Sequence, residues 1–460
     1  MMKASQQKAK IGPLSGGGNK KHADESPRFG HLRVSGLGLA KESQSVEHTN
    51  LKPRILAMKN QYLTVGAPSF CITILSYLLC VTSAHAESAI HTFRLPDGAM
   101  RAQAAVDATG KVHIVHQNAK VRGELLYVTH DAKKASFSKP VAVLQDAKAM
   151  AAGFNMTVSP KGRVHVITRP NPKYSKLVMG DEAFQTMFQS KQRFFVLRYM
   201  LHSRLNDAGT AFEKETNLVG ETIGFEGVGA VAVHPKTGWV HAFWAGQTEP
   251  GPEMGRDLYM ATSSDEGAHW SDPVKLDVDI LGNCRCCPIQ ATIDASGVLH
   301  VVQRNSVKTS ATSWDKDTYW LSSTDEGRTW SKQLVQKWEN CGCPGAPYSM
   351  AQGPKDVVFG FQTRGVASFA HTLDPTASVA APDSGSATSR PVVAVNQKGE
   401  VLFCWTEAQD VVWQLYDDKS QPVTGKGGRL EGVAAKWSQA ALATASNGDF
   451  HLYYDGVIAH

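Results

Sequence analysis

The chain has 460 residues, of which 42% are hydrophobic and 20% charged, the balance of an ordinary globular protein rather than a disordered or fibrous one. Its net charge of +6 is misleading, because residues 1–59 hold 11 Lys and Arg against 4 Asp and Glu and residues 60–86 hold none, which leaves −1 for the remainder. A basic body for nucleic-acid binding is therefore excluded, and no nucleic-acid partner is expected.

The first 86 residues are predicted to lie outside the folded domain. Residues 1–57 are rich in Gly, Ser, Lys and Gln and show no sustained apolar period, which predicts a disordered extension or a mis-annotated gene start. Residues 58–86 form a separate segment with a sequence pattern of its own. We therefore expect one folded domain, over residues 87–460.

Phe70–Thr82 is an apolar run of 13 residues, and Ala84-His85-Ala86 follows it. Such a run before an Ala-x-Ala-like site is typical of a secretory signal peptide, which is predicted over residues 58–86. The run is short for a membrane span of roughly 20 residues, and an uncleaved anchor is the alternative. The signal segment is thus the only expected contact with a membrane, and we expect a periplasmic or secreted protein.

From residue 87 on, one pattern recurs: an apolar strand, a turn with Gly, and a second strand. Apolar or alternating runs of this length between Gly turns predict strands rather than helices. The predicted second strands are Lys111–His116, Arg163–Thr168, Trp239–Trp244, Val298–Val302, Val357–Phe361, Glu400–Trp405 and Asp449–Tyr454. Repetition at tens of residues points to a propeller or a solenoid.

Six of the repeats are predicted to carry outer strands, whereas the last ends after its inner pair. Ile90–Leu95 is predicted to return and close that last blade, since closure removes exposed sheet edges. We predict an all-β propeller with four-stranded antiparallel blades, with seven blades favoured and six as the alternative. Residues 171–200 are an insertion, either a lid or a packed excursion, and Pro375–Ser389 is predicted to be a flexible connection.

Two copies of a short stretch follow third strands of the array. Both fit Ser/Thr-x-Asp-x-Gly-x-x-Trp, in which the Asp accepts backbone hydrogen bonds, the Gly takes a positive φ and the Trp packs between sheets. The residues are Ser263, Asp265, Gly267 and Trp270 in one copy and Ser323, Asp325, Gly327 and Trp330 in the other, with a weaker copy at Asp207 and Gly209.

These stretches resemble the Asp-boxes, or BNR repeats, of the sialidase superfamily of β-propellers. In that family the Asp-boxes lie on the face opposite the catalytic site. The resemblance covers roughly Arg101 to Tyr454. It implies a sialidase-like glycoside hydrolase whose arginines bind the substrate carboxylate, for which a guanidinium fork is suited.

Five arginines lie at the expected face, either before first strands or at the ends of second strands. The substrate-binding candidates are Arg101, Arg169, Arg304, Arg364 and Arg390. By resemblance, Arg101 takes the place of the family's Arg-Ile-Pro arginine, although Ala102 and Gln103 stand where the family has Ile and Pro.

A sialidase also needs a Tyr nucleophile with a Glu beside it and an acid/base Asp. Tyr453 and Tyr454 end the last second strand, and Glu226 and Glu407 lie at comparable blade positions. These four are the catalytic candidates. No acid/base Asp follows Arg101, because residues 118–122 contain none.

Cysteines cluster before two consecutive first strands. Cys284, Cys286 and Cys287 precede one strand, and Cys341 and Cys343 precede the next. The Cys-Cys-Pro and Gly-Cys-Pro loops resemble those of secreted bacterial sialidase-like proteins, and the resemblance implies disulfides. A thiolate metal site is the alternative, but no second Cys-x-x-Cys pair or nearby His completes four ligands, so neither a metal nor a cofactor is expected.

Two functions remain open on the sequence. One is exo-α-sialidase-like hydrolysis of sialic acid or related acidic sugars. The other is non-catalytic glycan or protein binding by a propeller of the cell envelope. A glycan or other acidic carbohydrate is the expected partner, and the oligomeric state is left open.

Overall fold

A computed structural model describes residues 88–146, 149–171, 174, 180, 182, 185, 199–224, 227–249, 255–278, 282–284, 287–308, 314–338, 347–434 and 438–456. The predicted extension and signal peptide lie outside these residues, as does most of the 171–200 insertion. Within them, no helix is long and apolar enough to cross a bilayer.

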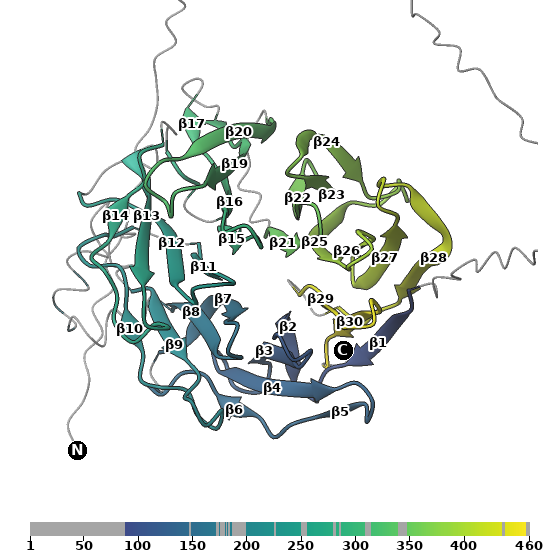
Figure 1. Cartoon of the computed structure of the whole chain (residues 1–460), viewed down its shortest axis with the longest axis horizontal. Coiled ribbons are helices and arrows are strands. Elements are labelled where there is room, and N and C mark those ends of the chain that lie inside the picture. The colour runs from purple at the N-terminus through teal and green to yellow at the C-terminus, as the bar shows by residue number, and fades with distance from the viewer. Residues whose placement is uncertain are drawn as a thin grey trace, which may run out of the picture. The chain divides into compact units, whose positions relative to one another are not determined.

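The domain is a ring of seven blades (Figure 1). Blades 1 to 7 are numbered by their first strands, which line the centre: β2 (Ala99–Val106), β7 (Ala151–Val158), β11 (Ala230–Val233), β15 (Gln290–Ile293), β21 (Ser349–Gln352), β25 (Thr388–Val395) and β29 (Ala441–Thr444). The second strands are β3 (Val112–Asn118), β8 (Val164–Pro170), β12 (Val240–Gly246), β16 (Leu299–Arg304), β22 (Val357–Thr363), β26 (Val401–Glu407) and β30 (Phe450–Tyr454). All seven predicted second strands are confirmed, and so is the favoured count of seven blades.

Antiparallel third and fourth strands complete blades 1 to 6. The third strands are β4 (Leu125–Asp131), β9 (Leu201–Arg204), β13 (Asp257–Ser263), β19 (Thr318–Ser323), β23 (Val366–His371) and β27 (Asp410–Tyr416). The outer strands are β5 (Ser136–Phe137) with β6 (Val141–Ala142), then β10 (Thr216–Asn217), β14 (Val274–Lys275), β20 (Ser331–Gln336), β24 (Asp374–Ala380) and β28 (Pro422–Leu430). A short hairpin of β17 (Val307–Lys308) and β18 (Trp314–Asp315) is inserted in blade 4.

Blade 7 joins the two ends of the domain. β1 (Ile90–Arg94) pairs in parallel with β30, so that the purple and yellow ends of the ring meet in Figure 1. Phe93 of β1 stacks on Tyr453 with ring centroids 5.6 Å apart. The predicted return of the N-terminal strand is confirmed.

The predicted flexible connection at Pro375–Ser389 is wrong in its first half. β24 occupies Asp374–Ala380 and pairs with β23 as the outer strand of blade 5. An outer strand faces solvent on one side, so its Thr, Ser and Ala side chains resemble loop composition, and its pattern has little apolar alternation.

The core lies between blades rather than inside one sheet. Apolar side chains of both faces of a blade pack on its two neighbours, so second strands are buried almost throughout. In blade 3, Trp244 and Phe243 are at most 1% exposed and point to opposite neighbours. This packing explains why the second strands read as continuous apolar runs.

The two strong Asp-boxes form the predicted turns. Asp265 Oδ1 accepts the His269 N–H at 2.9 Å, and the Ser263 hydroxyl accepts the Gly267 N–H at 2.7 Å. The second box repeats these bonds, and Trp330 donates its indole N–H to the Gly327 carbonyl at 2.9 Å. The carboxylates accept several such bonds, which hold the pKa of Asp265 below its usual range despite the opposing effect of burial.

The weaker copy differs from the prediction. Its turn is capped by Asn206, whose side-chain oxygen accepts the Thr210 N–H at 2.9 Å. Asp207, the predicted Asp-box carboxylate, instead pairs with Arg163. Gly209 has the expected positive φ of 67°.

The Asp-box glycines provide a stability test. Gly267 has a φ of 81°, and a Cβ there would lie 2.5 Å from His202 Cε1, whereas a Cβ at Gly209 would meet nothing within 4 Å. Gly209→Ala is therefore expected to cost about 1–2 kcal/mol of unfolding free energy from backbone strain alone. Gly267→Ala adds a clash and is expected to cost roughly 2–4 kcal/mol. Urea unfolding measures both, and equal losses would contradict the placement of His202.

Histidines recur in the second strands as buried, hydrogen-bonded side chains. His113 and His300 bond the turn carboxylates of Asp107 and Asp294 at 3.0 and 3.2 Å, and His241 bonds Thr262 at 3.0 Å. Among the described residues no group of three or more His, Cys, Asp or Glu side chains could hold a metal ion.

Buried histidines of the second strands and of β9 are expected to make the fold acid-sensitive. Burial, with smaller effects from nearby cations, lowers the pKa of His202 to about 3 and those of His241 and His451 to about 4. An unfolded His binds a proton near pH 6.5, so between pH 6.5 and 4 the unfolded state holds more protons and stability falls as pH falls. Each group contributes up to about 1.4 kcal/mol per pH unit. Urea unfolding at pH 7 and pH 5 measures the loss, and equal free energies would contradict it.

Candidate functional site

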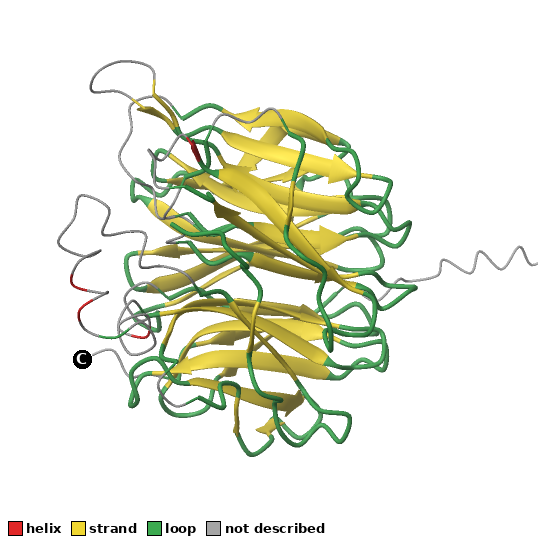
Figure 2. Cartoon of the chain, turned by 90° about the vertical axis from the view of Figure 1, so that its left-hand side faces the viewer, coloured by secondary structure: helices red, strands yellow, loops and turns green. Residues whose placement is uncertain are grey.

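The two faces of the ring carry different loops. Turns between first and second strands, and between third and fourth strands, lie on the Asp-box face, while first strands begin and second strands end on the opposite face. Figure 2 shows the strands running from one face to the other. The two faces of the ring can therefore carry two separate sites.

A pocket of about 270 Å³ opens on the face opposite the Asp-boxes, and three arginines line it. Arg101 comes from β2, Arg169 from the end of β8, and Arg390 from β25, so blades 1, 2 and 6 contribute one cation each. We call this cavity the arginine pocket. Its other lining residues are Gln103, Gln117, Ala152, Gly153, Phe154, Asn155, Gly227, Val228, Pro288, Ile289, Gln290, Pro347, Tyr348 and Gln439.

Arg101 and Arg390 occupy equivalent, strained positions. The pairing of β2 with β3 shifts register between Met100 and Gln103, and that of β25 with β26 shifts between Ser389 and Val392. Each bulge holds its arginine in the left-handed region, with φ of 51° and 54°. Arginine rarely adopts this conformation, and such strain is typical of functional positions.

Hydrogen bonds from blade 7 fix the backbone of Arg101. Its N–H donates to Ser438 Oγ at 3.0 Å and to Asp455 Oδ1 at 3.2 Å, and Ser438 Oγ donates to Asp455 Oδ1 at 2.7 Å. Both Ser438 and Asp455 are buried. The guanidinium in turn donates to Gln117 Oε1 at 3.3 Å.

The pocket is electrostatically prepared for an anion. Burial, followed by the positive charge of Arg101, lowers the pKa of Arg390 to about 10. Burial also lowers the pKa of Arg101, against the opposing effect of Asp455. Partly desolvated like charges repel one another, and a bound anion would relieve that repulsion.

Amide side chains form the floor of the arginine pocket. Asn155 donates to Gln290 Oε1 at 2.9 Å and accepts the Val231 N–H at 2.9 Å. Gln103 donates to the Phe154 carbonyl at 3.0 Å. This network ties blades 1 to 4 together beneath the arginines and leaves a neutral, hydrogen-bonding surface.

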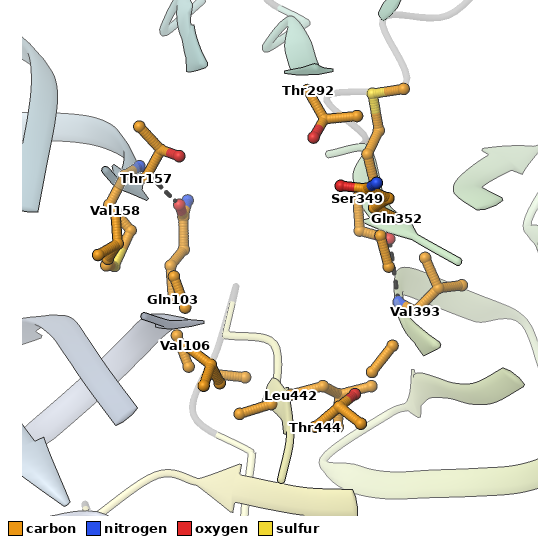
Figure 3. A pocket seen from close by; sticks show the side chains of 18 of the residues that line it. Gln103, Val106, Thr157, Val158, Thr292, Ser349, Gln352, Val393, Leu442 and Thr444 are labelled. Carbon is orange, nitrogen blue, oxygen red and sulfur yellow. Dashed lines mark hydrogen bonds between the residues drawn. The ribbon is translucent and has the colours of Figure 1, made fainter. Parts of the chain in front are cut away.

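Beneath the arginine pocket a central channel of about 530 Å³ continues between the first strands (Figure 3). Val106, Val158 and Leu442 line it with small polar side chains such as Thr292 and Ser349. The Ser349 hydroxyl accepts the Val393 N–H at 3.2 Å and so links blades 5 and 6. The channel is lined by uncharged side chains over most of its length, so the cationic chemistry is concentrated at its mouth.

Two of the five predicted arginines lie elsewhere. Arg304 is 2% exposed and donates to the carbonyls of Lys316 and Gln362 at 2.9 and 2.7 Å, so it joins blades 4 and 5. Arg364 lies in the exposed turn between β22 and β23. Neither lines the arginine pocket.

The predicted catalytic residues are not gathered at the pocket. Tyr453 is fully buried between blades 7 and 1 and lies 2.9 Å from His130 Nδ1, and Tyr454 packs against the core of blades 6 and 7. Glu407 accepts the Trp405 indole N–H at 3.0 Å and pairs with Arg429. Glu226 lies outside the described residues, next to Gly227 of the pocket wall.

Tyr348 is the pocket residue that sequence reasoning missed. Its phenol lies 3.2 Å from Thr318 Oγ1, and its ring is 5.8 Å from the Arg304 guanidinium. Burial raises its pKa to about 12, against the opposing effect of Arg304. The available signal was its place, directly before a first strand that starts at the same face as Arg101 and Arg390.

The cysteine loops are described only in part. Cys284 and Cys287 are buried before β15, and the hydrogen bond between the two side chains, together with burial, raises the pKa of the Cys287 thiol well above its usual value. Cys287 and Cys404 are unpaired thiols. Cys286, Cys341 and Cys343 lie outside the described residues, so the predicted disulfides stay a prediction.

Solved structures with similar folds include sialidases and other carbohydrate-active propellers. A Hadza microbial sialidase shares 13% identity at a TM-score of 0.45, covering 74% of this chain and 76% of its own. A Penicillium chrysogenum α-L-arabinanase complexed with arabinobiose shares 10% identity at a TM-score of 0.47, covering 72% of this chain and 98% of its own. A Trypanosoma rangeli sialidase shares 11% identity at a TM-score of 0.43, covering 72% of this chain and 53% of its own. No family model and no curated protein matches the sequence.

Proposed function

We propose that the protein recognises the carboxylate of a terminal acidic sugar, such as sialic acid, in the arginine pocket. The observation that carries this proposal is that Arg101, Arg169 and Arg390 line one pocket. Guanidinium groups bind carboxylates in charge-assisted, often bidentate pairs. The amide floor and the left-handed bulges at two of the arginines support the same reading.

The size of the pocket favours one sugar ring over a chain. At about 270 Å³ it lies near the lower end of small-molecule sites. A terminal sugar would place its carboxylate among the arginines and its hydroxyls on Gln103, Asn155 and Gln290. Isothermal titration with N-acetylneuraminate is expected to show saturable binding, while neutral N-acetylmannosamine shows none. Equal binding of the two sugars would refute carboxylate recognition.

Hydrolysis of sialosides is the second candidate, because a Tyr lines the same pocket. Tyr348 would be the nucleophile in place of Tyr453 and Tyr454, and Glu226, which directly precedes Gly227 of the pocket wall in the sequence, is the candidate for its carboxylate partner. A fluorogenic sialoside tests this role: turnover should disappear in Tyr348→Phe while N-acetylneuraminate binding persists. Absence of turnover in the native protein would contradict hydrolysis and leave carboxylate recognition as the only proposed function.

We further propose that this recognition takes place in the periplasm or outside the cell. The predicted signal peptide over residues 58–86 supports this location. N-terminal sequencing of the protein exported by a bacterial host is expected to begin at Glu87. A mature chain that still carries Phe70–Thr82 would show an uncleaved anchor instead.

A further inference from the structure

A separate cavity of about 250 Å³ lies on the Asp-box face, where the turns of blades 5 and 6 meet. Its walls come from the turns that join β21 to β22, β23 to β24, β25 to β26 and β27 to β28. In blades 3 and 4 the turns between third and fourth strands are Asp-boxes. In blades 5 and 6 the equivalent turns carry His371 and Ser420 instead.

Three side chains of this cavity form a connected chain of hydrogen bonds. Ser420 Oγ lies 3.1 Å from His371 Nε2. His371 Nδ1 lies 3.1 Å from Asp356 Oδ2 and 3.4 Å from Asp356 Oδ1. The side chains of Asp356 and His371 are 8% and 24% exposed, so the carboxylate is screened from solvent while the imidazole reaches the cavity.

The carboxylate determines the direction of these bonds. An ionised Asp356 can only accept, so the proton of a neutral His371 must lie on Nδ1. The Nε2 lone pair is then left to accept the Ser420 hydroxyl proton. This order of groups, a hydroxyl on Nε2 and a carboxylate on Nδ1, is that of nucleophile, general base and orienting acid in acyl transfer.

The turn holds the Ser420 hydroxyl in place. Ser420 has a φ of 60°, and its N–H donates to the Asp417 carbonyl at 3.0 Å. The Gln421 N–H donates to Asp417 Oδ1 at 2.8 Å and fixes the residue that follows. A serine backbone is strained in this left-handed conformation, which glycine adopts readily.

We propose that Ser420, His371 and Asp356 form a second active site that hydrolyses small carboxylic esters. Pro354, Leu373 and Val395 give the cavity an apolar wall suited to a short acyl group. Lys419 lines the same cavity, and its ammonium makes no ion pair with the described residues, so it can stabilise an oxyanion. This site is independent of the proposed sugar recognition on the opposite face.

The reaction is a two-step acyl transfer. Ser420 Oγ bonds to the ester carbonyl carbon while its proton moves to His371 Nε2, and that proton leaves with the alkoxy group as the C–O bond breaks. Water then attacks the acyl-serine, gives its proton to His371, and releases a carboxylic acid while Ser420 recovers its proton. No co-reactant other than water is required.

Covalent labelling of the full chain with a fluorophosphonate tests the nucleophile. The label is expected on the peptide that contains Ser420 and absent from Ser420→Gly. Glycine suits the φ of 60° at this position, so this variant should keep its fold. Ser331→Ala, a change at an exposed serine of β20, is the matched control, and Ser420 should be labelled in this variant as in the native protein. A native protein unlabelled at Ser420 would overturn the proposal.

Hydrolysis of p-nitrophenyl acetate tests the other two residues. His371→Gln is expected to lower kcat by about 100-fold or more. Asp356→Asn should lower kcat to a similar degree with KM unchanged, because Asp356 positions His371 without touching substrate. If either variant retains native kcat, the three side chains only tie turns together and the proposal is wrong.

Discussion

An Arg390→Met variant is expected to bind N-acetylneuraminate roughly 10–100-fold more weakly, because one charge-assisted pair is worth about 1.5–3 kcal/mol. The same variant should unfold at a higher temperature. Arg390 is partly desolvated beside the like charge of Arg101, so its removal relieves repulsion in the unliganded protein. Titration calorimetry and thermal unfolding measure the two effects.

The opposite signs of these effects distinguish a binding role from a structural one. A residue that only supports the fold loses stability when it is removed, whereas a residue kept for binding can cost stability in the free protein. Arg364→Met is the matched control, because Arg364 has a similar φ of 52° but does not line the pocket. It should change neither affinity nor unfolding temperature. A destabilised Arg390→Met with native affinity would contradict the proposed recognition.

The fold was predictable because its signals are local. A strand pair with a Gly turn can be recognised from roughly 15 residues, and the Asp-box turn closes its hydrogen bonds within five, as between Asp265 and His269. The number of blades followed from counting such pairs. β24 was missed because an outer strand has one solvated face and no apolar alternation to detect.

The face that carries the candidate site was predictable, but most of the side chains that line the pocket were not. Sequence position places Arg101 and Arg304 at the same side of the ring, but it does not show the bulge that turns Arg101 toward the pocket. Side chains in a regular strand project toward the neighbouring blades, not toward the channel mouth. Tyr453 and Tyr454 obey that rule and pack between blades, as does Arg304. Register irregularities therefore decide which candidates reach the arginine pocket.

The Ser420 cavity was missed for a different reason. Its three residues come from turns of two blades, and no spacing along the chain relates Asp356 to Ser420. The resemblance to sialidases also directs attention to the opposite face, since that family keeps its Asp-boxes away from the catalytic site. Blades 5 and 6 lack Asp-boxes, so their turns are available to carry other side chains.

Asp455→Ala is expected to lower the free energy of unfolding by roughly 1–3 kcal/mol, the usual loss when buried hydrogen-bond donors are left without their acceptor. Asp455 is 3% exposed, accepts hydrogen bonds from Arg101 and Ser438, and follows β30, the strand on which β1 closes the ring. Asp455→Asn keeps an acceptor for these donors and should lose less. Urea unfolding at pH 7 ranks the two variants.

The same substitution should also weaken binding of N-acetylneuraminate, by about 10-fold if Arg101 contributes one charge-assisted bond. Without Asp455 and its bond to Ser438, the left-handed backbone of Arg101 loses the acceptors that hold it. Asp449→Ala provides the control: Asp449 also lies in blade 7 and accepts the Ala89 N–H at 2.8 Å, but at the opposite face. It should lose stability and keep its affinity. Equal affinity in both variants would show that the contacts that close the ring do not position the pocket. A loss of affinity confined to Asp455→Ala would show that closing the propeller also sets its binding site.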